Sequence, residues 1–296
     1  MKFSRFKVFF PDSVQEASEL LREIGDDAKI LAGGQSLLPM MAFRLVKPKA
    51  LIDITNLGLV GVHVSPDQID IGGCATHRQI ETLQNLPVAF EALRDGMQVL
   101  GHVSIRNRGT VGGSLAHSDP SAEWPALALA FDAEIMATNK ESSRTVEAKE
   151  FSLGWFTSSL EPDEIVTSVL FRKPGELTAS SLVEVSRRSG DFALCGAICV
   201  LSSQNRSITQ TKIVVFGVAE TAVRLPVVEQ MVIGNAIFDD PVNVSRVARE
   251  SILEIIGNRS NDEKSGFVSQ IAAPDVVNNA LRKTIIRLQV EAKRKL

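Results

Sequence analysis

The chain has 296 residues, 44% of them hydrophobic, and its formal net charge at pH 7 is −3. This length and composition are typical of a globular protein that buries a large core in two or three domains. The small negative charge and an isoelectric point near 5.9 exclude nucleic acid and anionic membranes as favoured partners, because they provide no positive field for a polyanion. We find neither a signal-peptide pattern nor an apolar run of membrane-spanning length, and we therefore expect a cytoplasmic protein without stable membrane insertion.

The first 56 residues are predicted to alternate strands with helices. Ser13 and Glu16 form a capping box, which predicts a helix over about 14–24. The apolar runs 29–32 and 50–54 are predicted to be buried strands.

A pair of glycines follows the first of these buried strands. The run Ala32-Gly33-Gly34-Gln35-Ser36 leads into a predicted helix, with Ser36 as its N-cap and Pro39 in its first turn. A strand, a glycine turn and a helix start together form a geometry that binds phosphate, since the unpaired N–H groups and the helix dipole both favour an anion.

The middle of the chain contains a second glycine pair, in Thr110-Val111-Gly112-Gly113-Ser114. Glycines between small hydroxyl residues allow backbone N–H groups to turn outward, where a Cβ would block a ligand. We expect a side chain at Gly33 or Gly113 to collide with a bound phosphate and to be penalised by a positive φ. Two such loops in one chain predict that one diphosphate is held from two sides.

Short strands and helices are predicted around this second loop. Thr76 and Gln79 form a second capping box, and Pro87 begins another helix. The other predicted elements are a hairpin of 60–64 with 68–71, a helix over 124–131, and strands over 133–138, 144–148 and 165–171.

Lys173-Pro174-Gly175 is predicted to be a domain boundary, because a Pro-Gly pair breaks both helix and strand. Beyond it, three antiparallel strands are predicted at 182–185, 194–201 and 208–218, followed by helices over 242–256 and 276–292. The basic tail 293–295 is interpreted as a solvated helix end.

Few residues outside the glycine loops suggest chemistry. His117 has no evident nucleophile or carboxylate partner in the pattern, so we predict a supporting role beside the loop. Arg106 and Arg108 are predicted to face solvent or to hold the loop, rather than to bind phosphate. The three cysteines form no CxxC pair, so no metal or iron–sulfur site is expected on this chain. We identify no catalytic residue and no hydrolase, P-loop, zincin or Rossmann motif.

Three segments together resemble a known family. AGGQSLLP at 32–39, IRNRGTVGGSLAHSDP at 105–120 and RRSGDFAL at 187–194 are similar to the FAD-binding medium subunit of bacterial molybdenum hydroxylases, a family related to carbon monoxide, nicotine, quinoline-type and xanthine dehydrogenases. The resemblance implies an α+β fold with a PCMH-type FAD-binding domain over 1–174, made of two α/β subdomains at about 1–56 and 57–174. It further implies a C-terminal domain over 175–296, with a three-stranded antiparallel sheet and a helix bundle.

The resemblance also implies which residues bind FAD. Both glycine loops would hold the pyrophosphate, Glu123 would contact the adenosine side, and Ile165 occupies a flavin-contacting strand position. Phe192 matches an aromatic residue that shields the isoalloxazine ring in some relatives. The full implied set is Ala32, Gly33, Gly34, Gln35, Ser36, Leu37, Thr110, Val111, Gly112, Gly113, Ser114, Glu123, Ile165 and Phe192.

Finally, the resemblance implies a role in electron transfer. FAD on this chain would take electrons from the iron–sulfur clusters of a small subunit and pass them to an external acceptor, while a large subunit would carry the molybdenum cofactor. A dimer of such heterotrimers is expected. Two alternatives remain open: a self-sufficient flavin oxidoreductase with His117 as its proton-handling residue, and a scaffold subunit without FAD, which the intact glycines disfavour.

Overall fold

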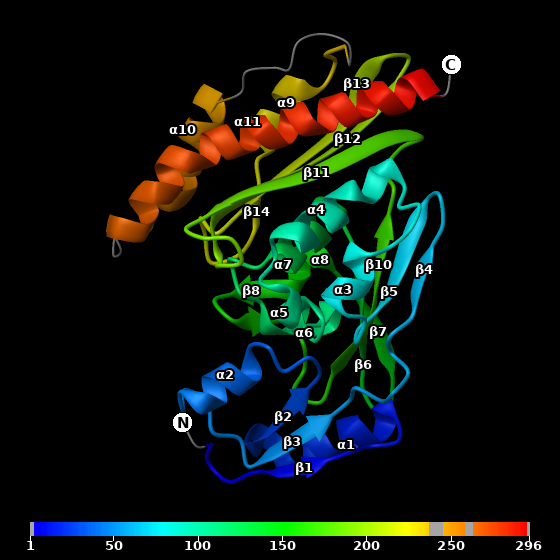
Figure 1. The fold of residues 1–296 in the computed structure, drawn as a ribbon, viewed down its shortest axis with the longest axis vertical. Coiled ribbons are helices and arrows are strands. Elements are labelled where there is room, and N and C mark those ends of the chain that lie inside the picture. The colour runs from blue at the N-terminus through cyan, green and yellow to red at the C-terminus, as the bar shows by residue number, and fades with distance from the viewer. Residues whose placement is uncertain (1–2, 237–244, 258–262, 295–296) are drawn as a thin grey trace.

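The computed structural model describes residues 3–236, 245–257 and 263–294, and it confirms the predicted mixed α and β architecture. Three main sheets follow one another along the long axis of the molecule, from the N-terminal part at one end to the long C-terminal helix at the other (Figure 1).

The N-terminal sheet has the strand order β1-β3-β2, and all of its pairs are parallel. Helices connect its strands, as parallel pairing requires. Its elements are β1 (Lys7–Phe9), α1 (Val14–Ile24), β2 (Ala28–Leu31), α2 (Leu37–Ala42) and β3 (Ala50–Asp53).

The predicted capping box of α1 forms with one change. The hydroxyl of Ser13 accepts a hydrogen bond from the Glu16 N–H at 3.1 Å, as expected. The Glu16 carboxylate, however, accepts from the N–H of Asp12 at 2.7 Å rather than from that of Ser13.

The middle sheet is antiparallel, with the order β4-β5-β10-β6-β7. Its strands are β4 (Val62–Val64), β5 (Gln68–Gly72), β6 (Glu134–Thr138), β7 (Ser143–Glu147) and β10 (Ile165–Arg172). The helices of this part are α3 (His77–Glu81), α4 (Glu91–Val99), α5 (Val103–Arg106), α6 (Val111–His117), α7 (Glu123–Ala130) and α8 (Ala148–Phe151), and the small hairpin pairs β8 (Ser152–Gly154) with β9 (Thr157–Ser158). The capping box predicted at Thr76 is complete.

The C-terminal sheet has four strands rather than the three that were predicted. They are β11 (Leu177–Ser186), β12 (Ala193–Gln204), β13 (Ser207–Phe216) and β14 (Val223–Arg224), in that order across the sheet. The fourth strand has only two residues, which is too short for a periodic signal.

Three helices complete this part: α9 (Pro226–Val232), α10 (Ser245–Gly257) and α11 (Glu263–Arg294). Helix α11 begins well before the predicted residue 276. Pro274 lies inside this helix. Lys293 and Arg294 are exposed in its last turn, which agrees with a solvated end. Residues 242–244 and 295 of the predicted helix and tail lie outside the described residues.

The C-terminal sheet separates two hydrophobic cores. On one face, Leu182, Val200 and Phe216 belong to the core of the middle part. On the other face, Cys199 and Leu281 belong to a core shared with the C-terminal helices. The chain passes from β10 to β11 at the predicted boundary near residue 174, but the sheet that follows remains packed on the part that precedes it.

Asp95 of α4 is the centre of a buried ion-pair cluster that joins these parts. Its carboxylate is 2.7 Å and 2.9 Å from the two terminal nitrogens of Arg287 and 2.9 Å from Nζ of Lys283, both on α11. It also accepts the Leu182 N–H of β11, and Arg287 donates to the Ser180 carbonyl. The cluster therefore connects α4, β11 and α11. It also provides hydrogen-bond partners for the Leu182 N–H and the Ser180 carbonyl of β11, which is an edge strand of its sheet.

We expect Asp95→Ala to destabilise the protein strongly, because it leaves the Arg287 guanidinium without its carboxylate in a mostly buried site. Breaking one partner of a buried pair costs about 3 to 5 kcal/mol, so the unfolding temperature should fall by roughly 10 °C. Glu250→Ala, at the exposed ion pair with Arg246, is the matched control and should change it by less than about 2 °C. Equal unfolding temperatures for Asp95→Ala and the native chain, measured by calorimetry, would contradict this role.

Candidate functional site

The structure brings the two glycine loops together. An added Cβ on Gly33 would lie 2.2 Å from the carbonyl oxygen of Arg108 and 2.7 Å from Cα of Gly109. The first loop thus touches the backbone just before the second, and only a residue without a side chain fits there. The two loops therefore lie next to each other, and a diphosphate held from two sides stays a prediction.

A small cavity of about 60 Å³ lies between the loops. Ala32 lines it from the first loop, Gly112 and Gly113 from the second, and Ile165 from the start of β10. Residues from three separate stretches of the predicted set, among them the isolated Ile165, therefore meet at one place.

The first loop offers free hydrogen-bond donors. Within the part of the chain that the structure describes, the backbone N–H groups of 33–36 have no acceptor. Gly34 has a φ of +71°, and the Gln35 side chain donates to the Gly33 carbonyl at 3.0 Å, which stabilises the turn. Ser36 occupies the N-cap position of α2 as predicted but makes no side-chain cap bond, and Leu37 opens the helix. Consecutive free N–H groups ahead of a helix favour an anionic ligand.

The second loop differs from this expectation. The N–H of Gly112 donates to the Gly73 carbonyl at 2.9 Å, and the N–H of Gly113 donates to the Thr110 hydroxyl at 3.2 Å. The prediction that both glycine N–H groups turn outward is therefore wrong. Val111 and Ser114 also donate within the chain, to the carbonyls of Ala75 and Thr110.

These glycines serve close packing instead. A Cβ on Gly112 would lie 2.7 Å from the Gly73 carbonyl oxygen, and one on Gly113 would lie 2.7 Å from Oγ1 of Thr110. The predicted positive φ is also wrong for Gly33 and Gly113; Gly34 alone in the two loops has one. The second loop thus presents a compact backbone surface opposite the donors of the first.

Glu123 lies in the first turn of α7 and is only 8% exposed. Burial, and secondarily the charge of Glu184, raises its pKa to about 8, so the carboxyl holds a proton at neutral pH. Burial also raises the pKa of Glu184 on β11 to about 7. The Oε2 atom of Glu184 is buried without a hydrogen-bond partner among the described residues. No pattern in the sequence distinguished this second acid.

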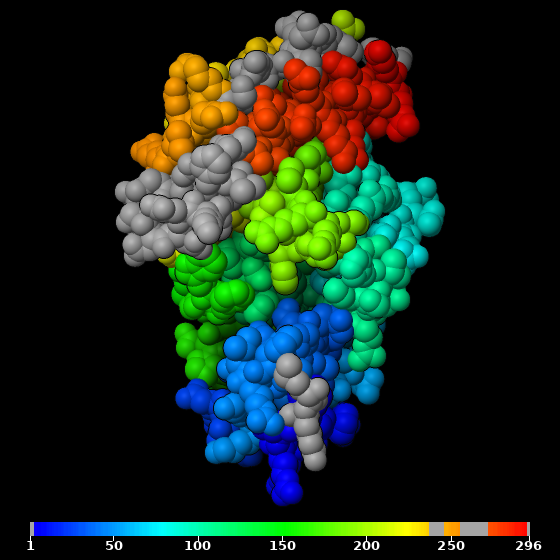
Figure 2. All heavy atoms as spheres, turned by 60° about the vertical axis from the view of Figure 1, so that its left-hand side comes forward, coloured from blue at the N-terminus to red at the C-terminus, as the bar shows by residue number. Residues whose placement is uncertain are grey.

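Phe192 lies in the connection between β11 and β12, where its side chain is 72% exposed. It does not line the cavity between the loops. In Figure 2 the yellow-green segment that contains this connection stands above the blue N-terminal part, on the face turned toward the viewer.

The other residues considered in the sequence take supporting positions. Arg106 is buried, donates to both carboxylate oxygens of Glu81 at 3.0 and 3.1 Å, and also donates to the carbonyls of Leu100 and Gly101. It holds the segment as predicted, while Arg108 is exposed. The ring of His117 contacts the Phe156 ring at 5.1 Å, and burial lowers its pKa. The described residues contain no cluster of metal ligands.

Two residues that the sequence analysis missed support the second loop. The Nε1–H of Trp124 donates to Nδ1 of His77 at 3.0 Å, and the His77 ring lies against Gly109. His77 was noted only as part of a capping box, because a contact with residues 32 and 47 positions away leaves no local signal.

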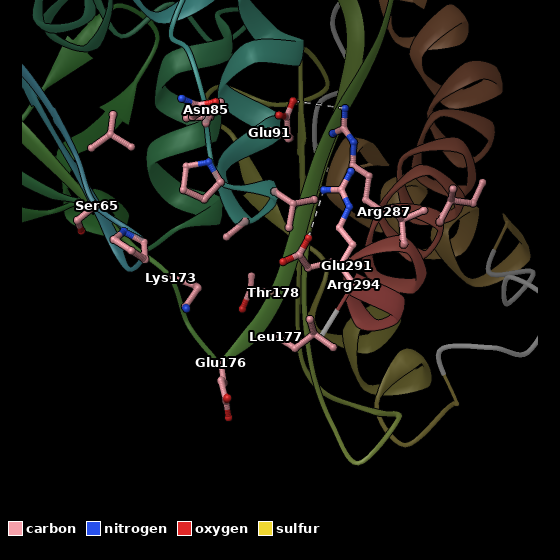
Figure 3. Close-up of a pocket in the computed structure, with 18 residues that line it drawn as sticks. Ser65, Asn85, Glu91, Lys173, Glu176, Leu177, Thr178, Arg287, Glu291 and Arg294 are labelled. Carbon is pink, nitrogen blue, oxygen red and sulfur yellow. Dashed lines mark ion pairs between the residues drawn. The ribbon is translucent and has the colours of Figure 1, made fainter. Parts of the chain in front are cut away.

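A larger cavity of about 710 Å³ lies elsewhere, between the turn after β4, the start of α4, the connection to β11, and α11 (Figure 3). Its arginines have acidic neighbours: Arg287 is 3.9 Å from Glu91, and Arg294 is 3.6 Å from Glu291. No residue of the predicted set lines it. Among the described helices, none is long and apolar enough to cross a membrane.

Comparison with known proteins identifies the family of the chain. Residues 4–172 match the family model described as the FAD binding domain in molybdopterin dehydrogenase, and residues 180–256 match the CO dehydrogenase flavoprotein C-terminal domain. The chain is 37% identical over 243 residues to 6-hydroxypseudooxynicotine dehydrogenase complex subunit alpha of Paenarthrobacter nicotinovorans, covering 80% of this chain and 81% of the relative. It is 33% identical over 289 residues to the nicotine 6-hydroxylase medium subunit of the same organism, covering 95% and 100%.

Solved structures are similar along almost the whole chain. A chain of carbon monoxide dehydrogenase from Hydrogenophaga pseudoflava superposes with a TM-score of 0.86 at 28% identity, covering 97% of this chain and 99% of that one. A chain of quinoline 2-oxidoreductase from Pseudomonas putida 86 gives a TM-score of 0.84 at 30% identity, covering 96% and 98%.

The raised pKa of Glu123 predicts a pH-dependent stability. Between about pH 4.5 and pH 8 the folded chain retains a proton that the unfolded chain loses, so the free energy of unfolding falls as pH rises. Glu123→Gln removes this pH dependence. The unfolding temperature of the variant minus that of the native chain should be at least about 2 °C larger at pH 8.5 than at pH 5. Glu150→Gln, at an exposed site, is the control for loss of an acid. A constant difference across this pH range would argue against a neutral buried carboxyl.

Proposed function

The chain belongs to the family of FAD-binding medium subunits of molybdenum-dependent dehydrogenases, and from that premise we propose that it binds FAD and relays electrons within a multi-subunit enzyme. In this proposal the flavin takes electrons from the iron–sulfur clusters of a small subunit and passes them to an external acceptor. The observation that carries the proposal is the run of free N–H groups at 33–36, which lies against the second glycine loop.

The residues present fit a dinucleotide. The free donors of the first loop suit the negative charge of a pyrophosphate, and the compact backbone of the second loop lets a ligand approach closely. The cavity between them accommodates only part of such a ligand, so the rest would extend along the adjoining surface. When bound, FAD supplies the redox chemistry, and the protein supplies binding and orientation.

Further members of the predicted set receive individual roles in the proposal. Glu123, protonated at neutral pH, can donate as well as accept a hydrogen bond on the adenosine side. Ile165 provides an apolar wall. Phe192 is exposed and has no hydroxyl, so it would cover the isoalloxazine ring without any acid–base role. We place the FAD-binding domain at 1–174 and the C-terminal domain at 175–296.

Two features support electron relay over substrate oxidation on this chain. His117, the nearest candidate acid–base residue, contacts Phe156, and burial lowers its pKa although the charge of Asp119 acts in the opposite direction. The part of the chain that the structure describes also holds no metal-ligand cluster. A self-sufficient oxidoreductase would need both a substrate pocket and a proton-handling group beside the loops. A scaffold subunit would not need the free donors.

Partner subunits complete the proposed enzyme. The relatives are named as medium subunits or chains, which supports a small iron–sulfur subunit and a large subunit with the molybdenum cofactor as partners of this chain. We propose a cytoplasmic dimer of such heterotrimers.

Gly33→Val should abolish FAD binding. The new side chain would collide with the Arg108 carbonyl and separate the loops, and each lost N–H contact to a charged group is worth about 1.5 to 3 kcal/mol. The measurement is the ratio of flavin to protein after purification with excess FAD. Gly154→Val is the control, because a Cβ there has no neighbour nearer than 3.8 Å. A full complement of FAD in Gly33→Val would show that this loop does not bind the pyrophosphate.

The isolated chain should bind FAD but should not oxidise the substrate of the whole enzyme. Under anaerobic conditions, a chemical reductant should bleach the visible absorbance of the flavin in the isolated chain. Candidate N-heterocycles, purines and aldehydes should bleach the flavin only when the chain is in a complex with the other two subunits. The mass of the natively purified protein shows whether these subunits are present. Bleaching of the isolated chain by one of these compounds would instead support the self-sufficient oxidoreductase.

A further inference from the structure

The segment that the first loop contacts is itself held by a buried histidine. His77 begins α3 and is 5% exposed. Its backbone N–H donates to the carbonyl of Gly109 at 3.0 Å, and its ring fills the space beside the Gly109 Cα. A Cβ added to Gly109 would lie 2.7 Å from both Cδ2 and Nε2 of the ring. The ring and the backbone of His77 thus both contact Gly109.

Trp124 fixes the orientation of this ring. Its Nε1–H donates to Nδ1 of His77 at 3.0 Å, and the two rings stack with centroids 6.0 Å apart. Burial, and secondarily the charge of Arg106, lowers the pKa of His77 to about 3. The ring is therefore neutral at physiological pH, with Nδ1 as a permanent acceptor and the proton on Nε2. Trp124 is wholly buried on α7, so the orientation of the ring is set by the core of the middle part.

The same short helix holds the segment at its other end. Glu81, in the last position of α3, forms the bidentate pair with Arg106. The stretch 106–109 is therefore fixed at both ends by one helix. Its backbone at Arg108 and Gly109 is the surface that Gly33 touches.

We infer that His77 is a positioning residue for FAD: by fixing Gly109, it sets the separation between the two glycine loops and hence the width of the site that holds the pyrophosphate. This inference depends on the proposed function. His77 touches neither the cavity nor the free donors, so it acts on the ligand only through Gly109.

The test uses the full chain and two substitutions that should compensate each other. Gly109→Ala places a methyl group against the His77 ring and should shift the stretch 106–109. We expect the FAD affinity to fall at least tenfold, a loss of the size measured for interactions between contacting residues. His77→Asn keeps an acceptor near the position of Nδ1 but removes the two ring atoms that the methyl group would meet. The double variant should therefore bind FAD more tightly than Gly109→Ala alone.

The readouts are the dissociation constant for FAD, from quenching of flavin fluorescence, and the unfolding temperature of the FAD-free chain. Gly154→Ala is the matched control and should leave the dissociation constant unchanged, since its Cβ meets no close neighbour. A purely structural role predicts that the dissociation constant follows the unfolding temperature of the FAD-free chain in all three variants, whereas positioning predicts a larger change in the dissociation constant than the unfolding temperature accounts for. If Gly109→Ala does not fold, recovery of both folding and FAD binding in the double variant supports the inference, and lack of recovery contradicts it.

The outcomes separate this inference from the proposed function. If the native chain binds no FAD, the proposed function fails. If the native chain binds FAD and Gly109→Ala, His77→Asn and the double variant all bind it equally well, only the positioning role of His77 is overturned.

Discussion

The candidate site depends on one close contact between two stretches of backbone. Gly33, at the end of the N-terminal sheet, meets Arg108 and Gly109 of the middle part at a distance that leaves no room for a Cβ. The contact joins elements from two different sheets, so it decides where the free donors of the first loop lie relative to the second loop. The position of an anion site here is thus set by packing, and the residues around it need only preserve that packing.

The two loops divide the work of binding unequally. The first has a positive φ at Gly34 and unpaired N–H groups, which suit a charged ligand. The second directs its N–H groups to Gly73, Ala75 and Thr110, and is rigid as a result. A rigid second loop opposite the donors of the first limits the conformational entropy that the protein loses when a ligand binds. Only the ligand and a few side chains then have to become ordered.

Local features of the site were predictable from the sequence, and contacts between distant residues were not. Strand, glycine turn and helix start at 29–37 depend on neighbouring residues, as does the capping box at Thr76, and both are present. The orientation of the Gly112 N–H depends on Gly73, which a pattern of adjacent residues does not reveal. Helix α11 also begins at Glu263, well before the predicted residue 276, and contains Pro274. Phe192 was recognised only through the family resemblance, and its exposure gives no independent support for a flavin contact.

Three acids on α4, α7 and β11 differ in how the fold accommodates their charge; Asp95 and Glu123 are buried, and Glu184 is partly buried. Asp95 is matched by Arg287 and Lys283, so its charge is satisfied within the chain and holds three elements together. Among the described residues Glu123 and Glu184 form no ion pair of this kind, and burial instead raises the pKa of each, so that protons replace counter-charges. A buried carboxyl oxygen without a donor, such as Oε2 of Glu184, has an unmet hydrogen-bonding capacity that stability alone does not explain. Glu123 lies on α7 and Glu184 on β11, the elements that follow the second loop and precede Phe192, whereas Asp95 lies on α4 and pairs with the C-terminal helix. The fold therefore joins α4 to the C-terminal helix through paired charges, whereas burial suppresses the charges of the carboxyls on α7 and β11.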